Sequence, residues 1–173
     1  MSLLALLVAT TLLDFDDAAD ATLWRPVDDV VMGGVSRSAF GIAEPGIARF
    51  SGIVSLENFG GFASVRTPAR DWDTAGATAF VLRVRGDGKH YKFTLRTGNG
   101  FDGIQYQARF QPPAAEWTDV RLPVESFVAT FRGRKVPLAP RLDPAKVRAL
   151  GLMISDKQAG EFELLVDYVS IER

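Results

Sequence analysis

The chain has 173 residues, of which 47% are hydrophobic and 24% are charged, and its formal net charge is −1. This length and composition predict one globular domain and exclude a disordered protein. Because there is no cysteine, disulfides, thiolate metal sites and cysteine nucleophiles are excluded. The chain also lacks the basic excess by which nucleic-acid-binding proteins neutralise phosphates, so we expect no nucleic-acid partner.

The N-terminal residues are apolar from Leu3 to Leu13 apart from Thr10 and Thr11. That run is shorter than the roughly 20 residues of a membrane-spanning helix, and no basic residue precedes it as in a signal peptide. We divide the chain into a tail or trimmed signal remnant at residues 1–11 and a single domain at residues 12–173. We expect a protein that is not integral to the membrane and is cytoplasmic, or periplasmic if the apolar start is a signal remnant.

An acidic cluster follows the apolar run. It lacks the turn glycine and the distal glutamate of an EF-hand, so we interpret it as a solvated strand end and predict no metal site, with a structural calcium ion as the open alternative. Its members are Asp14, Asp16, Asp17 and Asp20.

Alternation with a period of two dominates the rest of the chain. Apolar and polar residues alternate over residues 47–56, 80–85, 91–96 and 104–111, which is typical of strands with one face on a core and the other in water. Further strands are predicted at 117–122, 149–154 and 162–171. Many short strands with alternating faces predict an all-β, antiparallel sandwich or barrel, and the long crossing over residues 128–148 favours the sandwich.

Turn residues punctuate these strands. The segment 86–89 and the segment 98–100 are each rich in glycine and predict hairpins between the strands that flank them. Asp143 and Pro144 predict the only clear helical turn, as N-cap and first residue, with a second short turn around residues 125–127.

Candidate catalytic groups are few. His90 is the only histidine and lies beside a predicted hairpin, where a surface role is favoured over a catalytic triad. The pairs Gly33–Gly34 and Gly60–Gly61 are not followed by the helix that a phosphate-binding loop needs, so they indicate tight turns or close backbone packing. The chain contains acidic residues that could form a carboxylate pair for glycoside hydrolysis, but the sequence does not give the distance between two carboxylates that this mechanism requires. We predict no catalytic residue, no cofactor and no enzyme activity.

Several side chains are candidates for binding. Trp24, Trp72 and Trp117 lie near strand ends, where they either fill the core or stack on a ligand. Arg66, Arg83 and Asp29 are predicted to form a paired polar cluster on one sheet face, as a ligand floor or as a structural network.

Five ordered blocks resemble the complex I intermediate-associated protein 30 family. The stretch from Trp24 to Ser36, with the residues Met-Gly-Gly near its end, is similar to the family's opening signature, although Asp28 stands where asparagine is usual and Val30 where glycine is usual. The other blocks begin near residues 50, 82, 117 and 150, so the resemblance covers nearly everything from residue 12 onward.

The resemblance implies a galactose-binding-like jelly-roll sandwich and a non-catalytic role, since mitochondrial members assist the assembly of respiratory complex I. A short stand-alone domain of this kind is similar to bacterial members. In the signature blocks we expect Met32 to fill an irregular gap beside close backbone packing and Asn58 to form a turn of positive φ with Gly60 and Gly61.

Three functional hypotheses remain. The first is a protein-binding, chaperone-like assembly module with a patch built by loops around Trp24, Phe59 and Phe101, whose partner is a respiratory-complex intermediate if the family role transfers. The second is a carbohydrate or small-ligand domain with polar groups such as Arg66, Asp87 and Asp156 converging in a cleft. The third is an accessory subunit of a nucleotide-dependent enzyme, although the chain has no Rossmann fingerprint. The candidate binding residues are Trp24, Asp29, Met32, Asn58, Phe59, Arg66, Arg83, Asp87 and Asp156.

Overall fold

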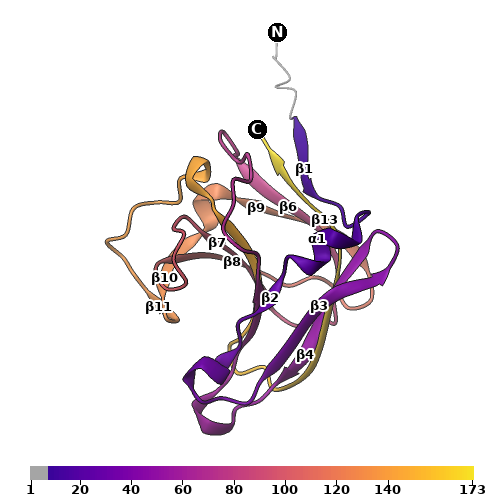
Figure 1. Ribbon diagram of the computed structural model, residues 1–173, viewed down its shortest axis with the longest axis vertical. Helices are drawn as coiled ribbons and strands as arrows, with labels where there is room; N and C mark the ends of the chain where they lie inside the picture. The colour runs from indigo at the N-terminus through magenta and orange to yellow at the C-terminus, as the bar shows by residue number, and fades with distance from the viewer. Residues whose placement is uncertain (1–7) are drawn as a thin grey trace.

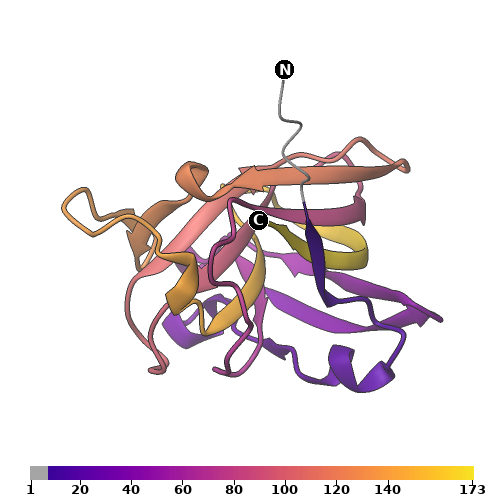
Figure 2. The same cartoon turned by 90° about the horizontal axis from the view of Figure 1, so that it is seen from above.

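A computed structural model describes residues 8–173, which form two antiparallel sheets packed face to face (Figures 1 and 2). The first sheet has the order β3-β4-β13-β6-β9, with β1 also paired to β13, and the second has the order β11-β10-β8-β7-β12-β5-β2. The predicted all-β jelly-roll sandwich is therefore confirmed. The strands of the first sheet are β1 (Ala9–Leu13), β3 (Arg37–Glu44), β4 (Ile47–Val54), β6 (Ala79–Arg85), β9 (Trp117–Pro123) and β13 (Gly160–Glu172). Those of the second are β2 (Arg25–Pro26), β5 (Ala63–Arg66), β7 (Tyr91–Arg96), β8 (Gln105–Phe110), β10 (Val128–Phe131), β11 (Arg134–Lys135) and β12 (Ala149–Ile154).

The core lies between the sheets and is built by the inward residues of the alternating runs. Phe80 and Leu82 of β6 are fully buried from one side, as are Phe93 and Leu95 of β7 from the other. The Phe80 and Phe93 rings lie 5.7 Å apart, across the interface between the sheets. Burial of a side chain of this size contributes roughly 1.5–3 kcal/mol, so the period of two predicts both the strands and the faces that stabilise them.

Helical segments are short. The predicted turn at Asp143 is confirmed as η4 (Pro144–Lys146), where the Asp143 carboxylate accepts a hydrogen bond from the Ala145 N–H, and the second predicted turn is η3 (Val124–Ser126). The structure adds α1 (Ala18–Thr22), η1 (Asp29–Met32) and η2 (Glu57–Phe59), which the sequence reading missed. Within residues 8–173 no helix has the length and apolar character that crossing a membrane requires.

The acidic cluster begins directly after β1, and Asp14, Asp16 and Asp17 are exposed, so the predicted solvated strand end is confirmed, while the later members also start α1. Asp17 is the N-cap, and its Oδ1 accepts a hydrogen bond from the Ala19 N–H at 2.9 Å. Asp14 accepts one from the Asp16 N–H. No group of three or more metal-binding side chains is close enough to hold an ion in the described part of the chain.

The predicted hairpin at residues 86–89 is wrong, because β6 and β7 belong to different sheets. The turn crosses the sandwich, and Asp87 holds it in place by accepting hydrogen bonds from the Tyr91 hydroxyl and from the Glu163 N–H, both at 3.0 Å. The pairing predicted across residues 98–100 is confirmed, since β7 and β8 are antiparallel neighbours. In that loop Gly103 has a φ of 142°, whereas Gly98 and Gly100 do not have positive φ.

Residues 9–11, which the sequence reading placed in the tail, belong to β1. Ala9 pairs with Glu172 and Thr10 with Ile171, so β1 lies beside the C-terminal strand β13 (Figure 1). Of the rest of the predicted tail, Val8 lies just before β1, and residues 1–7 lie outside the described residues.

Candidate binding surfaces

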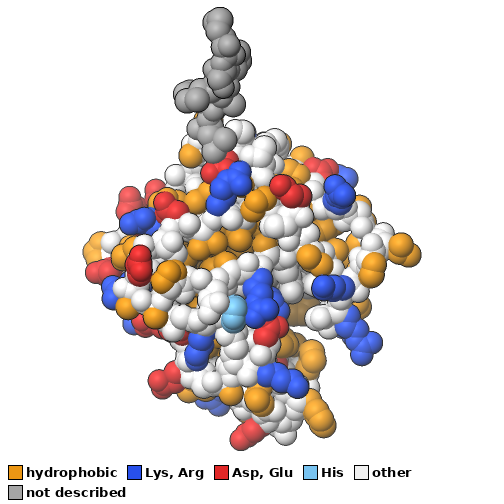
Figure 3. All heavy atoms as spheres, turned by 180° about the vertical axis from the view of Figure 1, so that it is seen from behind, with side chains coloured by type: hydrophobic (Ala, Val, Ile, Leu, Met, Phe, Trp, Pro, Cys, Tyr) orange, Lys and Arg blue, Asp and Glu red, His pale blue; other side chains and the backbone are white. Residues whose placement is uncertain are grey.

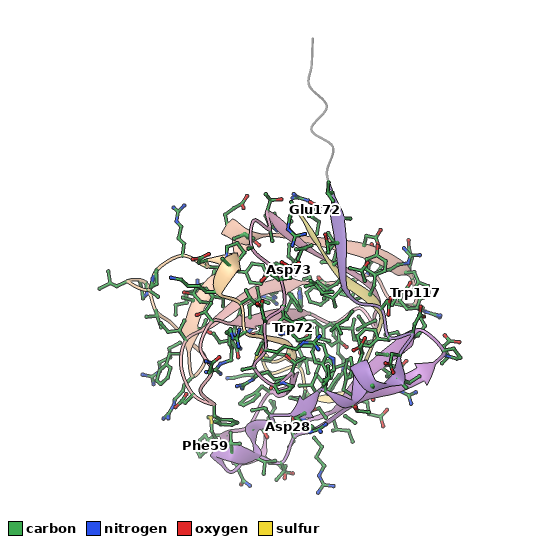
Figure 4. The ribbon with its side chains drawn as sticks, turned by 45° about the horizontal axis from the view of Figure 1, so that its top comes forward. Asp28, Phe59, Trp72, Asp73, Trp117 and Glu172 are labelled. Atoms are coloured by element: carbon green, nitrogen blue, oxygen red, sulfur yellow. The ribbon has the colours of Figure 1, made fainter. Side chains whose placement is uncertain are left out.

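A buried carboxylate organises one end of the sandwich, next to Asp28, which is labelled near the lower edge of Figure 4. Asp29, at the start of η1, is 0% exposed. Its Oδ1 accepts a hydrogen bond from the Ser36 N–H at 2.9 Å, and its Oδ2 accepts from the Ser36 hydroxyl at 2.6 Å and from the Gly61 N–H at 2.7 Å. Burial alone would raise the pKa of Asp29, but these hydrogen bonds outweigh it and hold the pKa below the usual 3.8. The ionised carboxylate thus ties η1 to the start of β3 and to the loop before β5.

Asp28 makes a second tie beside the first. Its Oδ1 accepts hydrogen bonds from the Ser38 hydroxyl at 2.6 Å and the Ser64 N–H at 2.9 Å, and its Oδ2 accepts from the Ser38 N–H at 2.9 Å. All three partners are donors, so a carboxylate satisfies this position fully without the amide donor of an asparagine. Ser38 belongs to the first sheet and Ser64 to the second, and Asp28 therefore joins the two sheets. We call Asp28 and Asp29 the aspartate clasp.

The two glycine pairs surround the clasp, as the prediction of close backbone packing requires. A Cβ at Gly34 would lie 2.3 Å from Asp29 Oδ1, and one at Gly60 would lie 2.6 Å from Asp29 Oδ2. Asn58 has φ of 54° and Gly61 has φ of 147°, which confirms the predicted positive-φ turn, although Gly60 itself is extended. The glycines are thus needed to let the backbone close around a buried charge.

The surface of this end is apolar. Phe59, in η2, has φ of 62° and is fully exposed, so an aromatic ring stands in water on a backbone conformation that is unfavourable for it. The prediction that Met32 fills a gap is wrong, because its side chain is 64% exposed. Phe59 lies at the lower end of the molecule in Figure 4, and Figure 3 shows hydrophobic atoms at that end from behind. We call this surface the apolar tip; its exposed members are Val30, Val31, Met32, Leu56 and Phe59.

A groove of about 700 Å³ runs over the outer face of the second sheet. Its lining includes six charged residues, four cationic and two anionic. The Asp102 carboxylate pairs with Arg132 at 2.6 Å, and Asp156 pairs with Lys92 at 3.0 Å. The charged members are Arg66, Lys92, Arg96, Arg132, Asp102 and Asp156.

Two guanidinium groups in the groove have no carboxylate partner among the described residues. Arg66 donates a hydrogen bond to the Phe101 carbonyl at 3.1 Å and lies 5.4 Å from the centre of its ring. Arg96 is only 7% exposed and has no side-chain hydrogen bond or ion pair within residues 8–173. Burial together with the neighbouring charge of Arg96 lowers the pKa of Arg66 to about 10. The two arginines therefore form a desolvated cationic pair.

The predicted cluster of Asp29, Arg66 and Arg83 is wrong, since the structure separates all three. Arg83 lies on the first sheet and pairs with Asp119 and Asp167, Arg66 lies in the groove, and Asp29 is buried in the clasp. Asp156 shares the groove with Arg66, whereas Asp87 holds the β6–β7 crossing and is not part of the groove lining.

The loop patch predicted around Trp24 is also wrong in part. Trp24 is buried and stacks on Phe40, with ring centres 4.5 Å apart, and Trp72 is likewise buried (Figure 4). Phe59 is exposed on the apolar tip, and Phe101 is exposed at the groove. Sequence reasoning missed Arg96, because on the alternation pattern it is one of several polar residues on the outward face of a strand.

A family model described as complex I intermediate-associated protein 30 matches residues 13–166. The mitochondrial complex I intermediate-associated protein 30 of Neurospora crassa is 28% identical over 137 residues, covering 69% of this chain and 49% of the relative. That of Drosophila melanogaster is 24% identical, covering 86% and 58%. An uncharacterized protein of Schizosaccharomyces pombe is 28% identical over 84% of this chain and 76% of its own length. The chain thus spans about half the length of these mitochondrial relatives.

Solved structures with the same fold include carbohydrate-binding modules. The family 11 module of the Clostridium thermocellum cellulase Lic26A-Cel5E superposes with a TM-score of 0.70 at 15% identity, covering 98% of this chain and 97% of the module. A family 11 module from the same organism, in complex with a β-1,3-1,4-mixed-linked tetrasaccharide, gives a TM-score of 0.68 at 16% identity, with 94% coverage of both chains. At these identities the likeness establishes the β-sandwich and nothing further.

Proposed function

Because this chain belongs to the complex I intermediate-associated protein 30 family, we propose that it is a non-catalytic protein-binding module that holds an intermediate of a respiratory complex through its apolar tip. The family's mitochondrial members carry in their name an association with complex I intermediates. The residues that resemble the family signature build the aspartate clasp, and the clasp presents the tip.

The observation that carries the proposal is the exposure of Phe59 and Val31 on a rigid support. Apolar groups gathered at one end of a domain favour a protein or membrane partner. Aromatic side chains are frequent anchors of protein interfaces, and a ring fixed on a short helical turn loses little conformational freedom on binding. The clasp hydrogen bonds hold η1 and η2 together, so the tip is preformed.

Site-specific cross-linking tests the partner. A photoreactive phenylalanine analogue at position 59 is expected to form adducts with respiratory-complex subunits in native membranes, identified by mass spectrometry. The matched control is the same analogue at Leu138, which is 98% exposed in a different loop and is expected to give none of these adducts. Equal labelling from both positions, or no respiratory subunit from position 59, would contradict the proposal.

A double substitution tests the consequence for assembly. Val31→Asp with Phe59→Asp replaces two of the five exposed apolar side chains of the tip by carboxylates, and aspartate tolerates the positive φ of position 59. In a strain that lacks the wild-type gene, we expect this variant to restore several-fold less assembled complex on native gels, and Leu138→Asp to restore it fully. Loss of one anchor of about 2 kcal/mol corresponds to roughly 30-fold weaker binding.

A second candidate function is binding of a carbohydrate or other small ligand in the groove. It is favoured by the volume of the groove and by the polar side chains that converge in it, Gln105 and Gln107 among them. A glycan array and a thermal-shift screen of small ligands test it, and blank results in both would remove it.

A further inference from the structure

The groove of the second sheet carries more positive than negative charge, although the whole chain has a net charge of −1. Its two carboxylates, Asp102 and Asp156, are each committed to a cation, and Asp102 also accepts a hydrogen bond from the Gly103 N–H at 3.0 Å. Arg66 and Arg96 are the two cationic residues of the groove lining that take part in none of these ion pairs. The excess of two positive charges is thus located at two specific guanidinium groups.

Burial makes these two groups unlike ordinary surface arginines. A cation that leaves water loses hydration free energy, and this loss is recovered only through a counter-charge and hydrogen bonds. Among the described residues Arg96 makes no side-chain hydrogen bond and has no carboxylate within 4 Å, so the charge of Asp102 acts on it only from farther away, while 7% of the residue is exposed. Burial lowers its pKa as well as that of Arg66. The pair is therefore unfavourable in the unliganded fold, and an anion between the two groups would relieve it.

The surroundings leave room for such an anion. Arg66 and Arg96 both line the groove of about 700 Å³, together with the amide side chains of Gln105 and Gln107. The loop that carries Phe101 and Gly103 borders the same groove, and Arg66 contacts both the ring and the carbonyl of Phe101. This one hydrogen bond and the ring contact hold the Arg66 guanidinium in position before a ligand arrives.

We propose that Arg66 and Arg96 form an oxyanion-binding subsite in this groove, and that its ligand is a small molecule bearing a phosphate or carboxylate group. Guanidinium groups bind both oxyanions through paired N–H donors, and a groove of about 700 Å³ accommodates a ligand of small-molecule size. The inference rests on the groove being a ligand site, as in the second candidate function. The groove borders the apolar tip, since Val31 and Met32 line it, but the two arginines are not members of the tip.

Isothermal titration and thermal shift at low ionic strength test the subsite with inorganic pyrophosphate, with citrate and with an uncharged β-glucan tetrasaccharide. We expect one or both anions to bind and to raise Tm, and the tetrasaccharide to bind more weakly. Pyrophosphate and citrate separate a phosphate ligand from a carboxylate ligand. The affinity is expected to fall as salt is added, because the contact is ionic.

Three variants locate the site. Arg96→Met and Arg66→Met are each expected to weaken anion binding at least tenfold. Arg83→Gln is the control, since this arginine is paired and lies on the first sheet, and it is expected to bind anions as the wild type does. In the absence of any anion, Arg96→Met is expected to keep or raise Tm, because it replaces a buried, unpaired cation by an apolar group of similar length.

The proposal is overturned by any of three results. One is the absence of binding by both anions to the wild type. Another is wild-type affinity for anions in Arg96→Met. The third is a fall of several degrees in the Tm of unliganded Arg96→Met together with tetrasaccharide binding that equals anion binding, which would make Arg96 a structural residue of a neutral-sugar groove. Loss of anion binding with unchanged cross-linking from position 59 separates this subsite from the assembly role.

Discussion

The outer faces of the two sheets carry arginines in opposite states. On the first sheet, Arg83 reaches Asp119 and Asp167 at 3.3 Å each, and all three side chains are more than one third exposed. On the second sheet, Arg96 is nine-tenths buried and has no carboxylate within 4 Å among the described residues. An exposed pair is nearly neutral for stability, whereas a buried, unpaired cation is unfavourable. Pairing and burial, more than the number of charges, distinguish a candidate binding face from a solvated one.

The loops explain the difference. The face of the second sheet is enclosed by the 97–104 loop and by the turn at Arg132 and Gly133, all of which border the groove. The face of the first sheet leaves its ion pairs open to water. The aspartate clasp lies at the junction of the two sheets and holds both in place.

Of the substitutions that compare the two sheets, removing Asp29 of the clasp should change the stability of the fold most. Asp29→Ala deletes a buried acceptor of several hydrogen bonds and leaves the Ser36 and Gly61 donors unpaired, which is expected to lower the free energy of unfolding by about 3 kcal/mol or more. Urea denaturation followed by fluorescence measures it. Asp119→Ala, on the exposed face of the first sheet, is the control and should lose less than about 1 kcal/mol. Equal losses would show that the clasp does not stabilise the fold.

Substitution of one glycine on each sheet allows the packing of the two sheets to be compared directly. A Cβ at Gly151, on the second sheet, would lie 2.3 Å from Thr94 Oγ1 and 3.0 Å from the Val65 carbonyl, whereas one at Gly41, on the first sheet, meets nothing within 4 Å. Gly151→Ala is expected to destabilise by about 1–3 kcal/mol through overpacking. Gly41→Ala should be neutral or stabilising by up to about 1 kcal/mol. Thermal denaturation of both variants checks the contrast, and a reversed order would refute it.

Acid should weaken the clasp. The pKa of Asp29 is lowered in the folded protein, so between that value and 3.8 the folded state binds fewer protons than the unfolded state, and stability rises with pH. The stabilisation from Asp29 is present above pH 3.8 and is lost as pH falls through the folded-state pKa. Tm measured from pH 2.5 to 6 should fall less steeply on the acid side for Asp29→Asn than for the wild type. Parallel curves would contradict this.

The smallest effect is expected on the open face of the first sheet. Arg83→Gln removes two exposed ion pairs and should lower the free energy of unfolding by less than about 1 kcal/mol, with the difference shrinking in 0.5 M salt. Chemical denaturation at two salt concentrations measures it. A loss above 2 kcal/mol would show that the two faces do not differ as described.

The fold followed from the sequence wherever the cause was local. Alternation over residues 80–85 and 91–96 placed Phe80, Leu82, Phe93 and Leu95 inward, and Asp143 with Pro144 marked η4 correctly. Which strands pair with one another was harder to predict from the sequence. The glycines near residue 87 indicate a reversal equally well whether the chain re-enters the same sheet or crosses to the other, because turn chemistry does not depend on which sheet follows.

The candidate sites show the same division. Close packing at Gly34 and Gly60 was predicted from the glycine pairs, but the carboxylate they surround was placed on a sheet face with Arg66 and Arg83. The helix α1 was missed although Asp17 stands before Ala18 and Ala19 as an N-cap would, because a five-residue segment carries too little periodicity to be recognised.

The sequence by itself determined the all-β class, the inward faces of the strands and the family, because these depend on residue type, on a period of two and on the order of motifs along the chain. Only the tertiary structure decided that Asp28 and Asp29 join the sheets, that Phe59 stands exposed, and that Arg66 and Arg96 meet in one groove. These contacts join residues up to tens of positions apart, and their energetics depend on burial and on which partners are already engaged. Both are properties of the packed sheets, and no local pattern encodes them.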